Sequence, residues 1–126
     1  ARTRSYIAEM YEPFYKTLPI KPRELVAMAG TATTLVTVRD AIAEYDPSLV
    51  HGQHVSSHEI DEMVSRLASL TSKEREEIIG LEPKRAGVIL AGVLIIAEIM
   101  RISKLSEVTI SDYDILYGII LSAALF

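Results

Sequence analysis

Leu25-Val-Ala-Met-Ala-Gly-Thr-Ala-Thr-Thr34 is an apolar run that reaches a glycine and continues into a threonine-rich segment. The apolar run predicts a short buried strand that ends just before Gly30. Leu35, Val38 and Ile42 then follow at helical spacing, and this period favours a helix although the β-branched composition would also suit a strand. A strand followed by a glycine and a helix N-terminus indicates an α/β fold.

The start of this expected helix is a candidate phosphate site. Glycine adopts backbone angles that other residues avoid and lets a ligand approach closely. The amides of Thr31 to Thr34 would be free donors at the positive end of the helix dipole, which together attract anions. Threonine is also a common N-cap for structural reasons alone, and this alternative stays open. The candidate phosphate-binding residues are Gly30, Thr31, Ala32, Thr33 and Thr34.

The composition of the chain limits the classes of function that it can have. The chain has 126 residues, 49% of them apolar and 24% charged, which suits one small globular domain. A net charge of −4 disfavours broad binding to nucleic acid. The chain has no cysteine, which excludes disulfides and thiolate metal sites and fits a cytoplasmic protein. No secretory signal is visible in residues 1–20.

Residues 86–97 form a run of twelve uncharged residues. A membrane-spanning helix needs roughly 20 such residues, so we expect a helix that starts with Pro83 in its first turn and is packed on nearly all faces. A membrane span is the weaker alternative.

The other elements follow from local signals. Apolar residues at helical spacing predict an amphipathic helix at the start of the chain, kinked or divided at Pro13. Capping boxes predict two further helices, of which the second is short and ends at Gly80. Residues 50–55 suggest a short extended piece. The capping boxes are Ser56 with Glu59 and Thr71 with Glu74, and Ser111 with Asp114 opens a last helix.

Only two strands are convincing, residues 25–29 and 107–110. Long helical crossovers between strands imply parallel neighbours. Two strands are too few for a stable sheet, so residues 1–126 are expected to be one segment of a longer domain. Such a piece exposes a sheet edge or apolar helix faces, and we expect it to self-associate.

Several phrases together resemble the exopolyphosphatase and guanosine pentaphosphate phosphatase family, and their order and spacing are more specific than any single phrase. The resemblance covers roughly residues 20–121. The phrases are Gly30-Thr31-Ala32-Thr33-Thr34-Leu35, Glu44-Tyr45-Asp46-Pro47, Val50-His51-Gly52, Leu67-Ala68-Ser69-Leu70-Thr71, Gly80-Leu81-Glu82-Pro83-Lys84-Arg85-Ala86 and Val108-Thr109-Ile110-Ser111-Asp112.

The resemblance implies a fold and an activity. The family has the actin, Hsp70 and sugar-kinase fold, which is ribonuclease H-like, and this chain looks like the later part of the second α/β domain. The family hydrolyses phosphoanhydride bonds of polyphosphate or guanosine pentaphosphate in a cleft between two domains, with magnesium offsetting the charge. Gly30 to Thr34 match the later of two phosphate loops. The first domain, the earlier loop and the acidic residue that activates water are absent, so the chain holds half of a site and is expected to be inactive alone.

A second hypothesis is a binding or interaction module that kept the fold without the chemistry. Leu116 and Tyr117 stand where the family has Arg and Glu, and Gly87 stands where Asp is frequent.

Arg85 and the three histidines can each be interpreted as functional or as structural residues. Arg85 lies at an expected helix start, where a cation opposes the helix dipole; it can contact an anionic substrate or pair with Glu82. His51, His54 and His58 have a spacing that zinc sites use, but no fourth ligand is evident, and surface or turn positions are the favoured reading.

Overall fold

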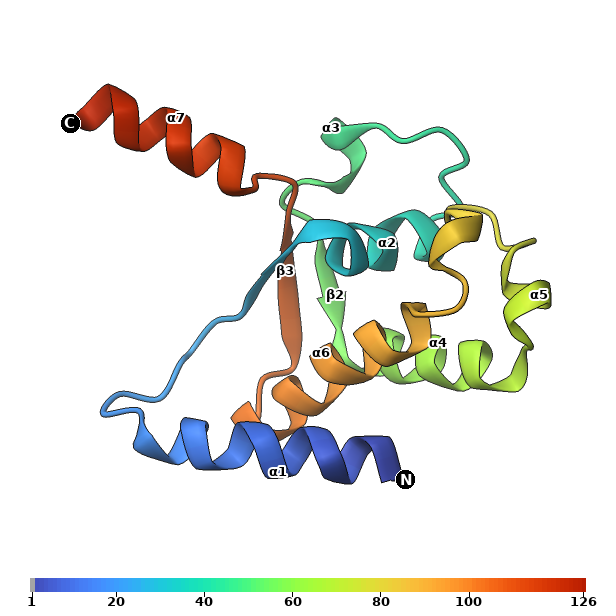
Figure 1. The fold of residues 1–126 in the computed structure, drawn as a ribbon, viewed down its shortest axis with the longest axis horizontal. Coiled ribbons are helices and arrows are strands. Elements are labelled where there is room, and N and C mark those ends of the chain that lie inside the picture. The colour runs from blue at the N-terminus through green and yellow to red at the C-terminus, as the bar shows by residue number, and fades with distance from the viewer. Residues whose placement is uncertain (1) are drawn as a thin grey trace.

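The computed structural model describes residues 2–126, and Figure 1 shows a small sheet surrounded by helices. The predicted class, a helix-rich α/β fold with few strands, is confirmed. The elements in chain order are α1 (Arg2–Thr17), β1 (Val26–Met28), α2 (Ala29–Arg39), α3 (Pro47–Val50), β2 (His54–Ser56), α4 (Ser57–Ser69), α5 (Ser72–Arg75), the 3-10 turn η1 (Pro83–Arg85), α6 (Ile89–Ser103), β3 (Glu107–Ser111) and α7 (Ile115–Leu125).

The sheet has three strands in the order β1-β3-β2. The two strands expected from the sequence are present and parallel, with Val26 opposite Thr109 and Met28 opposite Ser111. The extended piece contributes the third strand, β2, which is antiparallel to β3 and places Val55 opposite Val108. Because β3 lies between the other two, β1 has a neighbour on one side only within the described chain.

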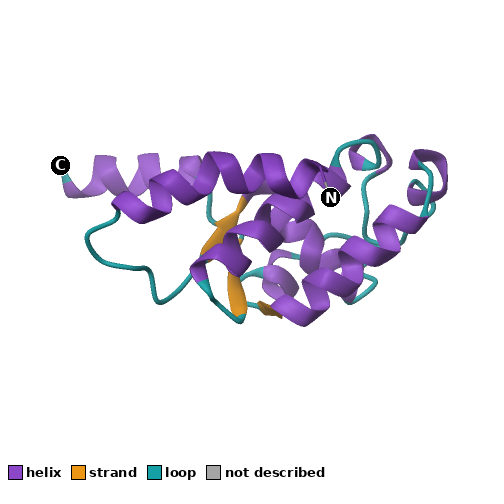
Figure 2. Cartoon of the chain, turned by 90° about the horizontal axis from the view of Figure 1, so that it is seen from below, coloured by secondary structure: helices purple, strands orange, loops and turns teal. Residues whose placement is uncertain are grey.

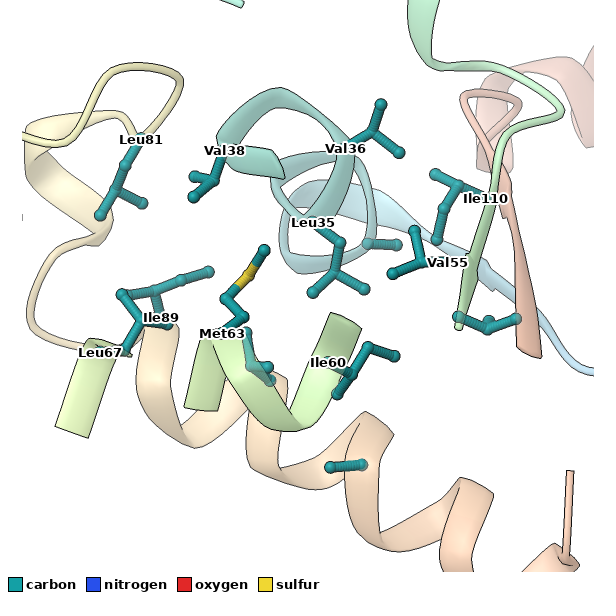
Figure 3. Close-up of a cluster of buried hydrophobic side chains, with 14 of the residues drawn as sticks. Leu35, Val36, Val38, Val55, Ile60, Met63, Leu67, Leu81, Ile89 and Ile110 are labelled. Carbon is teal, nitrogen blue, oxygen red and sulfur yellow. The ribbon is translucent and has the colours of Figure 1, made fainter. Parts of the chain in front are cut away.

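Helix α2 is the centre of the core. Figure 3 shows its side chains between the sheet on one side and helices α4 and α6 on the other. Leu35 and Val36 are fully buried, and the residues around them meet Ile60 of α4 and Ile110 of β3. Complete burial of such side chains supplies about 1.5–3 kcal/mol each. The core therefore holds α2 from both sides and determines where its N-terminus lies.

Helix α1 lies along α6, as the views in Figures 1 and 2 agree. It runs through Pro13 as one element and is not divided there. An ion-pair network joins the two helices around Glu98, which is 2% exposed. Arg4 of α1 donates to this carboxylate at 3.2 Å, and Arg101 donates to it at 2.7 Å. The hydrogen bond from Arg101 lowers the pKa of Glu98 by more than burial raises it.

Both internal capping boxes are confirmed. The Ser56 hydroxyl accepts from the Glu59 amide at 3.1 Å, and the Glu59 carboxylate accepts from the Ser56 amide at 2.7 Å. Thr71 and Glu74 make the same reciprocal pair at 3.2 and 2.7 Å. Each pair satisfies two donors at a helix start that would otherwise lack partners.

Three helix boundaries differ from the sequence expectation. Helix α5 ends at Arg75 rather than at Gly80. The long apolar helix begins at Ile89, because η1 and the turn around Gly87 intervene after Pro83, and glycine is a poor helix former. The last helix is capped by Asp114 alone, whose side chain accepts from the Leu116 amide at 2.9 Å. Within the described chain, neither α6 nor any other helix is long and apolar enough to cross a bilayer.

The start of α2 also differs, since the helix begins at Ala29 and not after Gly30. The left-handed backbone angle expected at Gly30 belongs to Ala29, whose φ is 72°. A Cβ in this region collides with the backbone and costs about 1–2 kcal/mol. The positive φ of the strand-to-helix turn is therefore adopted by an alanine, which lowers the free energy of unfolding, and not by Gly30.

Replacing Ala29 with glycine is expected to stabilise the chain. The variant removes the steric cost of the positive φ but adds backbone freedom to the unfolded state, which leaves a net gain of about 0.5–1 kcal/mol in the free energy of unfolding. Urea unfolding followed by circular dichroism measures it. Ala32→Gly, inside the same helix, is the control and should destabilise; a loss of stability in Ala29→Gly would contradict the assignment of strain.

Replacing Glu98 with glutamine is expected to lower the free energy of unfolding by about 2 kcal/mol at pH 7, since charge-assisted hydrogen bonds are lost. The folded-state pKa of Glu98 is lowered, so its contribution is present above the unfolded value of about 4.3 and is lost as pH falls through the folded pKa. The difference between wild type and variant should therefore shrink below about pH 4. If urea titrations show that the difference in the free energy of unfolding between wild type and variant stays constant down to pH 2, the ion-pair network does not contribute as described.

Candidate functional site

The N-terminus of α2 opens at the carboxyl ends of the parallel strands β1 and β3, where Met28 lies opposite Ser111. Met28 is the N-cap residue and gives no side-chain hydrogen bond to the helix. The first amides of a helix have no carbonyl partner within it, and here these are the amides of Ala29 to Thr31. Free amides at a positive helix end are the elements of an anion site.

The free donors lie earlier than the sequence predicts. The amides of Thr33 and Thr34 fall inside the helix, because α2 starts at Ala29. Their hydroxyls are bound to helix carbonyls as well: Thr34 donates to the Gly30 carbonyl at 2.6 Å, and Thr33 lies 3.3 Å from the same oxygen. The side chain of Ala32 is buried at 1% exposure. Among the predicted residues, Gly30 and Thr31 therefore hold the available amides.

Thr31 packs against the long apolar helix. A Cβ placed on Gly92 of α6 would lie 2.5 Å from the Thr31 hydroxyl oxygen. Gly92 thus allows α6 to approach the first turn of α2, which supports the backbone that presents these amides.

Gly30 is close to the guanidinium group of Arg85. A Cβ on Gly30 would lie 2.0 Å from Nη1 of Arg85, so the arginine occupies the space that any side chain would fill. Arg85 also pairs with Glu82, at 3.2 Å between Nε and Oε2. Of the two sequence readings of Arg85, the ion pair with Glu82 is therefore observed, and the guanidinium group also lies at the uncapped start of α2.

A cavity of about 440 Å³ lies beside this helix end. Its walls come from α2, from the segment that follows α2, and from the residues around η1. The lining residues are Thr33, Thr34, Thr37, Ile42, Ala43, Tyr45, Gly80, Leu81, Glu82, Pro83 and Arg85.

Gly80 shapes the floor of this cavity. Its φ is 89°, and a Cβ there would lie 2.0 Å from the carbonyl oxygen of Thr37. The Thr37 hydroxyl donates to the Gly80 carbonyl at 2.6 Å. Glycine is therefore required here both by backbone conformation and by the close approach of α2.

Tyr45 connects the cavity to the end of β3, and sequence reasoning assigned it no role. Its hydroxyl donates to the carboxylate of Asp112, while the Asp112 amide donates to Nδ1 of His51 at 3.1 Å. Burial and the Asp112 hydrogen bond raise the pKa of Tyr45 to about 12. His51 in turn stacks on Tyr113, with ring centroids 4.1 Å apart. The signal available in the sequence was that Tyr45 and Asp112 lie in two of the family phrases.

The three histidines do not converge. Besides His51, His54 lies 3.6 Å from Glu107, and His58 lies 3.4 Å from Glu62 on its own helix. No group of three or more potential metal-ligating side chains occurs among residues 2–126.

Replacing Tyr45 with phenylalanine is expected to remove one ionisation near pH 12 from the spectroscopic titration of the six tyrosines. Asp112→Asn is the companion variant, because without the carboxylate the pKa of Tyr45 should move down toward its usual value of about 10. Ultraviolet absorbance of tyrosinate measures both changes. An unchanged titration in Asp112→Asn would exclude that carboxylate as a cause of the raised pKa of Tyr45.

Comparison with known proteins identifies the family of this chain. Residues 1–125 match the Ppx/GppA phosphatase family. Exopolyphosphatase 2 of Mycobacterium tuberculosis is 33% identical over 126 residues, which cover 96% of this chain and 40% of that protein. A bifunctional 3-dehydroquinate synthase/phosphatase of Fusobacterium nucleatum is 37% identical over 97 residues, covering 77% of this chain and 14% of that protein.

A solved structure extends the match to the fold. The crystal structure of the Aquifex aeolicus Ppx/GppA family member aligns with a TM-score of 0.91 and 26% identity, over 98% of this chain and 40% of that chain. The present chain therefore spans about 40% of the length of the exopolyphosphatase relatives and of this structure. The resemblance seen in the sequence phrases and the actin-like fold that it implies are confirmed. The chain belongs to the Ppx/GppA phosphatase family.

Proposed function

We propose that this chain is the phosphate-binding segment of a phosphoanhydride hydrolase that acts on inorganic polyphosphate or guanosine pentaphosphate. The observation that carries the proposal is the uncapped N-terminus of α2 with the Arg85 guanidinium against Gly30. The Arg85 guanidinium lies against the first turn of α2, and Glu82 is the acidic side chain paired with it. An anion at this point would be attracted by the helix end and by Arg85.

The chain's own residues supply part of the chemistry. The amides of Gly30 and Thr31 orient a phosphate group, and Arg85 neutralises charge on it, two of the contributions that phosphoryl transfer requires. A third contribution, an oriented water, needs a base close to the phosphate. Because the chain spans 40% of its relatives' length, we assign that base to the part of the parent protein outside residues 1–126.

Magnesium is expected in the parent by family resemblance. The described residues offer no cluster of carboxylates or histidines that would hold it, and magnesium commonly binds through one or two carboxylates together with substrate phosphates. We therefore assign its protein ligands outside this chain and derive no step from it here.

The alternative is a phosphate- or nucleotide-binding module without catalysis. Leu116 and Tyr117, which replace the polar pair of the family phrase, lie on α7 and are 65% and 46% exposed. Tyr117 stacks on Tyr113 at 4.3 Å and contributes no charge. The two functions differ in the parent protein: phosphate release from polyphosphate supports the hydrolase, and binding without release supports the module.

Replacing Gly30 with alanine is expected to weaken polyphosphate binding to the 126-residue chain about tenfold, the effect of losing one charge-assisted contact. The new methyl group would displace the flexible end of Arg85, so stability should change little. Arg85→Ala should weaken binding to a similar degree. Isothermal titration calorimetry with polyphosphate and with guanosine pentaphosphate measures each affinity.

Gly118→Ala is the matched control, because a Cβ there meets nothing within 4 Å. Equal affinities in Gly30→Ala, Arg85→Ala and wild type would refute the site. Release of phosphate by the isolated chain would refute the assignment of the catalytic base to another part of the parent.

A further inference from the structure

His51 is an exposed histidine that the proposed phosphate site does not use, although it contacts the segment after β3 in two ways. Its Nδ1 accepts a hydrogen bond from the Asp112 amide at 3.1 Å. Its ring stacks on the ring of Tyr113, with centroids 4.1 Å apart and an angle of 21° between the planes. One side chain therefore contacts both of the first two residues after β3.

The backbone around His51 is bonded to the same strand. The Gly52 amide donates to the Ile110 carbonyl at 2.8 Å, and the Ile110 amide donates to the Gln53 carbonyl at 2.8 Å. The His51 amide donates to the Pro47 carbonyl at 2.9 Å and ends α3. These bonds fix the backbone from which the ring reaches the end of β3.

The hydrogen bond from the Asp112 amide specifies the protonation state of His51. An N–H donor needs a lone pair on Nδ1, and only the neutral imidazole with its proton on Nε2 has one there. The charged imidazolium carries N–H groups at both ring nitrogens and accepts no hydrogen bond. Histidine changes between these forms in the range of about pH 5 to 8. The observed bond therefore exists only with the neutral ring.

The titratable and charged groups on the elements around His51 do not replace this bond with an ion pair. They are Asp46 at the start of α3, Tyr45 before it, Asp112 and Tyr113 after β3, Asp114 and Tyr117 at the start of α7, and Arg39 of α2, which donates to Gln53 and pairs with Asp40. Among residues 2–126, the histidine rings in ion-pair contact with a carboxylate are those of His54 and His58.

Asp112 connects His51 to the cavity beside α2. Its carboxylate accepts from the hydroxyl of Tyr45, and Tyr45 lines the cavity. Burial and this hydrogen bond raise the pKa of Tyr45 to about 12, so the phenol stays a donor over the whole range in which a histidine titrates. The amide and the carboxylate belong to one residue, and a shift of the Asp112 backbone therefore moves the acceptor of Tyr45.

We propose that His51 is a pH-sensitive support of the segment after β3, whose neutral ring holds the Asp112 amide and, through the Asp112 carboxylate, the position of Tyr45. A proton from solvent reaches the exposed ring, occupies Nδ1 and breaks the bond to the amide. The stack on Tyr113 persists, because a cation is attracted to an aromatic face. The inference does not depend on whether the cavity binds phosphate.

A nuclear magnetic resonance titration of the chain between about pH 8 and pH 5, the range of histidine ionisation, tests the proposal. We expect the Asp112 amide proton to shift with the same midpoint as the carbon-bound protons of the His51 ring. Hydrogen-exchange protection of this amide should fall about tenfold, the factor for loss of one hydrogen bond. The ring protons of Tyr45 should follow the same midpoint.

His51→Asn separates the hydrogen bond from the titration, because a side-chain amide carbonyl accepts from the same N–H group and does not ionise. In this variant the Asp112 amide should stay protected at low pH, and Tyr45 should not respond. His58→Asn is the matched control, since His58 pairs with Glu62 on its own helix; it should leave the response of Asp112 unchanged. Asp112→Ala keeps the backbone amide without the carboxylate, so the amide should still respond and Tyr45 should not.

Two results would overturn the inference. One is an Asp112 amide in the wild-type chain whose shift and protection do not change as His51 ionises, and the other is an equal change in His51→Asn. A response of Tyr45 that persists in Asp112→Ala would overturn the connection through the carboxylate. Circular dichroism at both ends of the pH range excludes unfolding as the cause. None of these measurements uses polyphosphate, so a failure of the proposed function would leave them unaffected.

Discussion

Burial of α2 is the constraint on which the rest of this structure depends. Every residue from Thr34 to Val38 is buried, so the helix has no solvent face over this stretch. A buried hydroxyl needs a partner, and the two buried threonines find theirs in the carbonyls of Gly30 and Gly80. The same burial that makes the core therefore also fixes the helix start and the loop that forms the cavity floor.

The concentration of positive charge at the N-terminus of α2 follows from the burial of this helix. Because α2 is held by packing, its N-terminus needs no side-chain cap, and none is present. The free amides then lie beside Arg85, a cation at the wrong end of a helix dipole. Glu82 offsets part of this positive charge, but it pairs with Lys84 as well, at 3.5 Å. Under the proposed function, a bound phosphate would offset the positive charge that remains there.

The features that the sequence predicted correctly are local ones. Capping boxes depend on residues three apart, and the strand around Ala27 depends on one apolar run, so both could be recognised without tertiary information. The contact of Arg85 with Gly30 joins residues 55 positions apart and could not be recognised, although both residues were candidates. The positive φ of Ala29 was missed for another reason: glycine is the usual residue for that conformation, and a glycine was next to it.

The cavity beside the start of α2 and helix α7 are both connected to the end of β3. Tyr45, which lines the cavity, is bound to Asp112, and the next residue, Tyr113, stacks between His51 and Tyr117 of α7. Helix α7 buries no side chain of its own, and this aromatic stack joins its first turn to the end of β3. With Leu116 and Tyr117 at these positions α7 carries no charged residue, and Tyr117 supplies the ring that completes the stack. Asp112 and Tyr113 are adjacent in the chain, so the hydrogen bond that holds Tyr45 at the cavity and the stack that holds the start of α7 depend on the same short segment after β3.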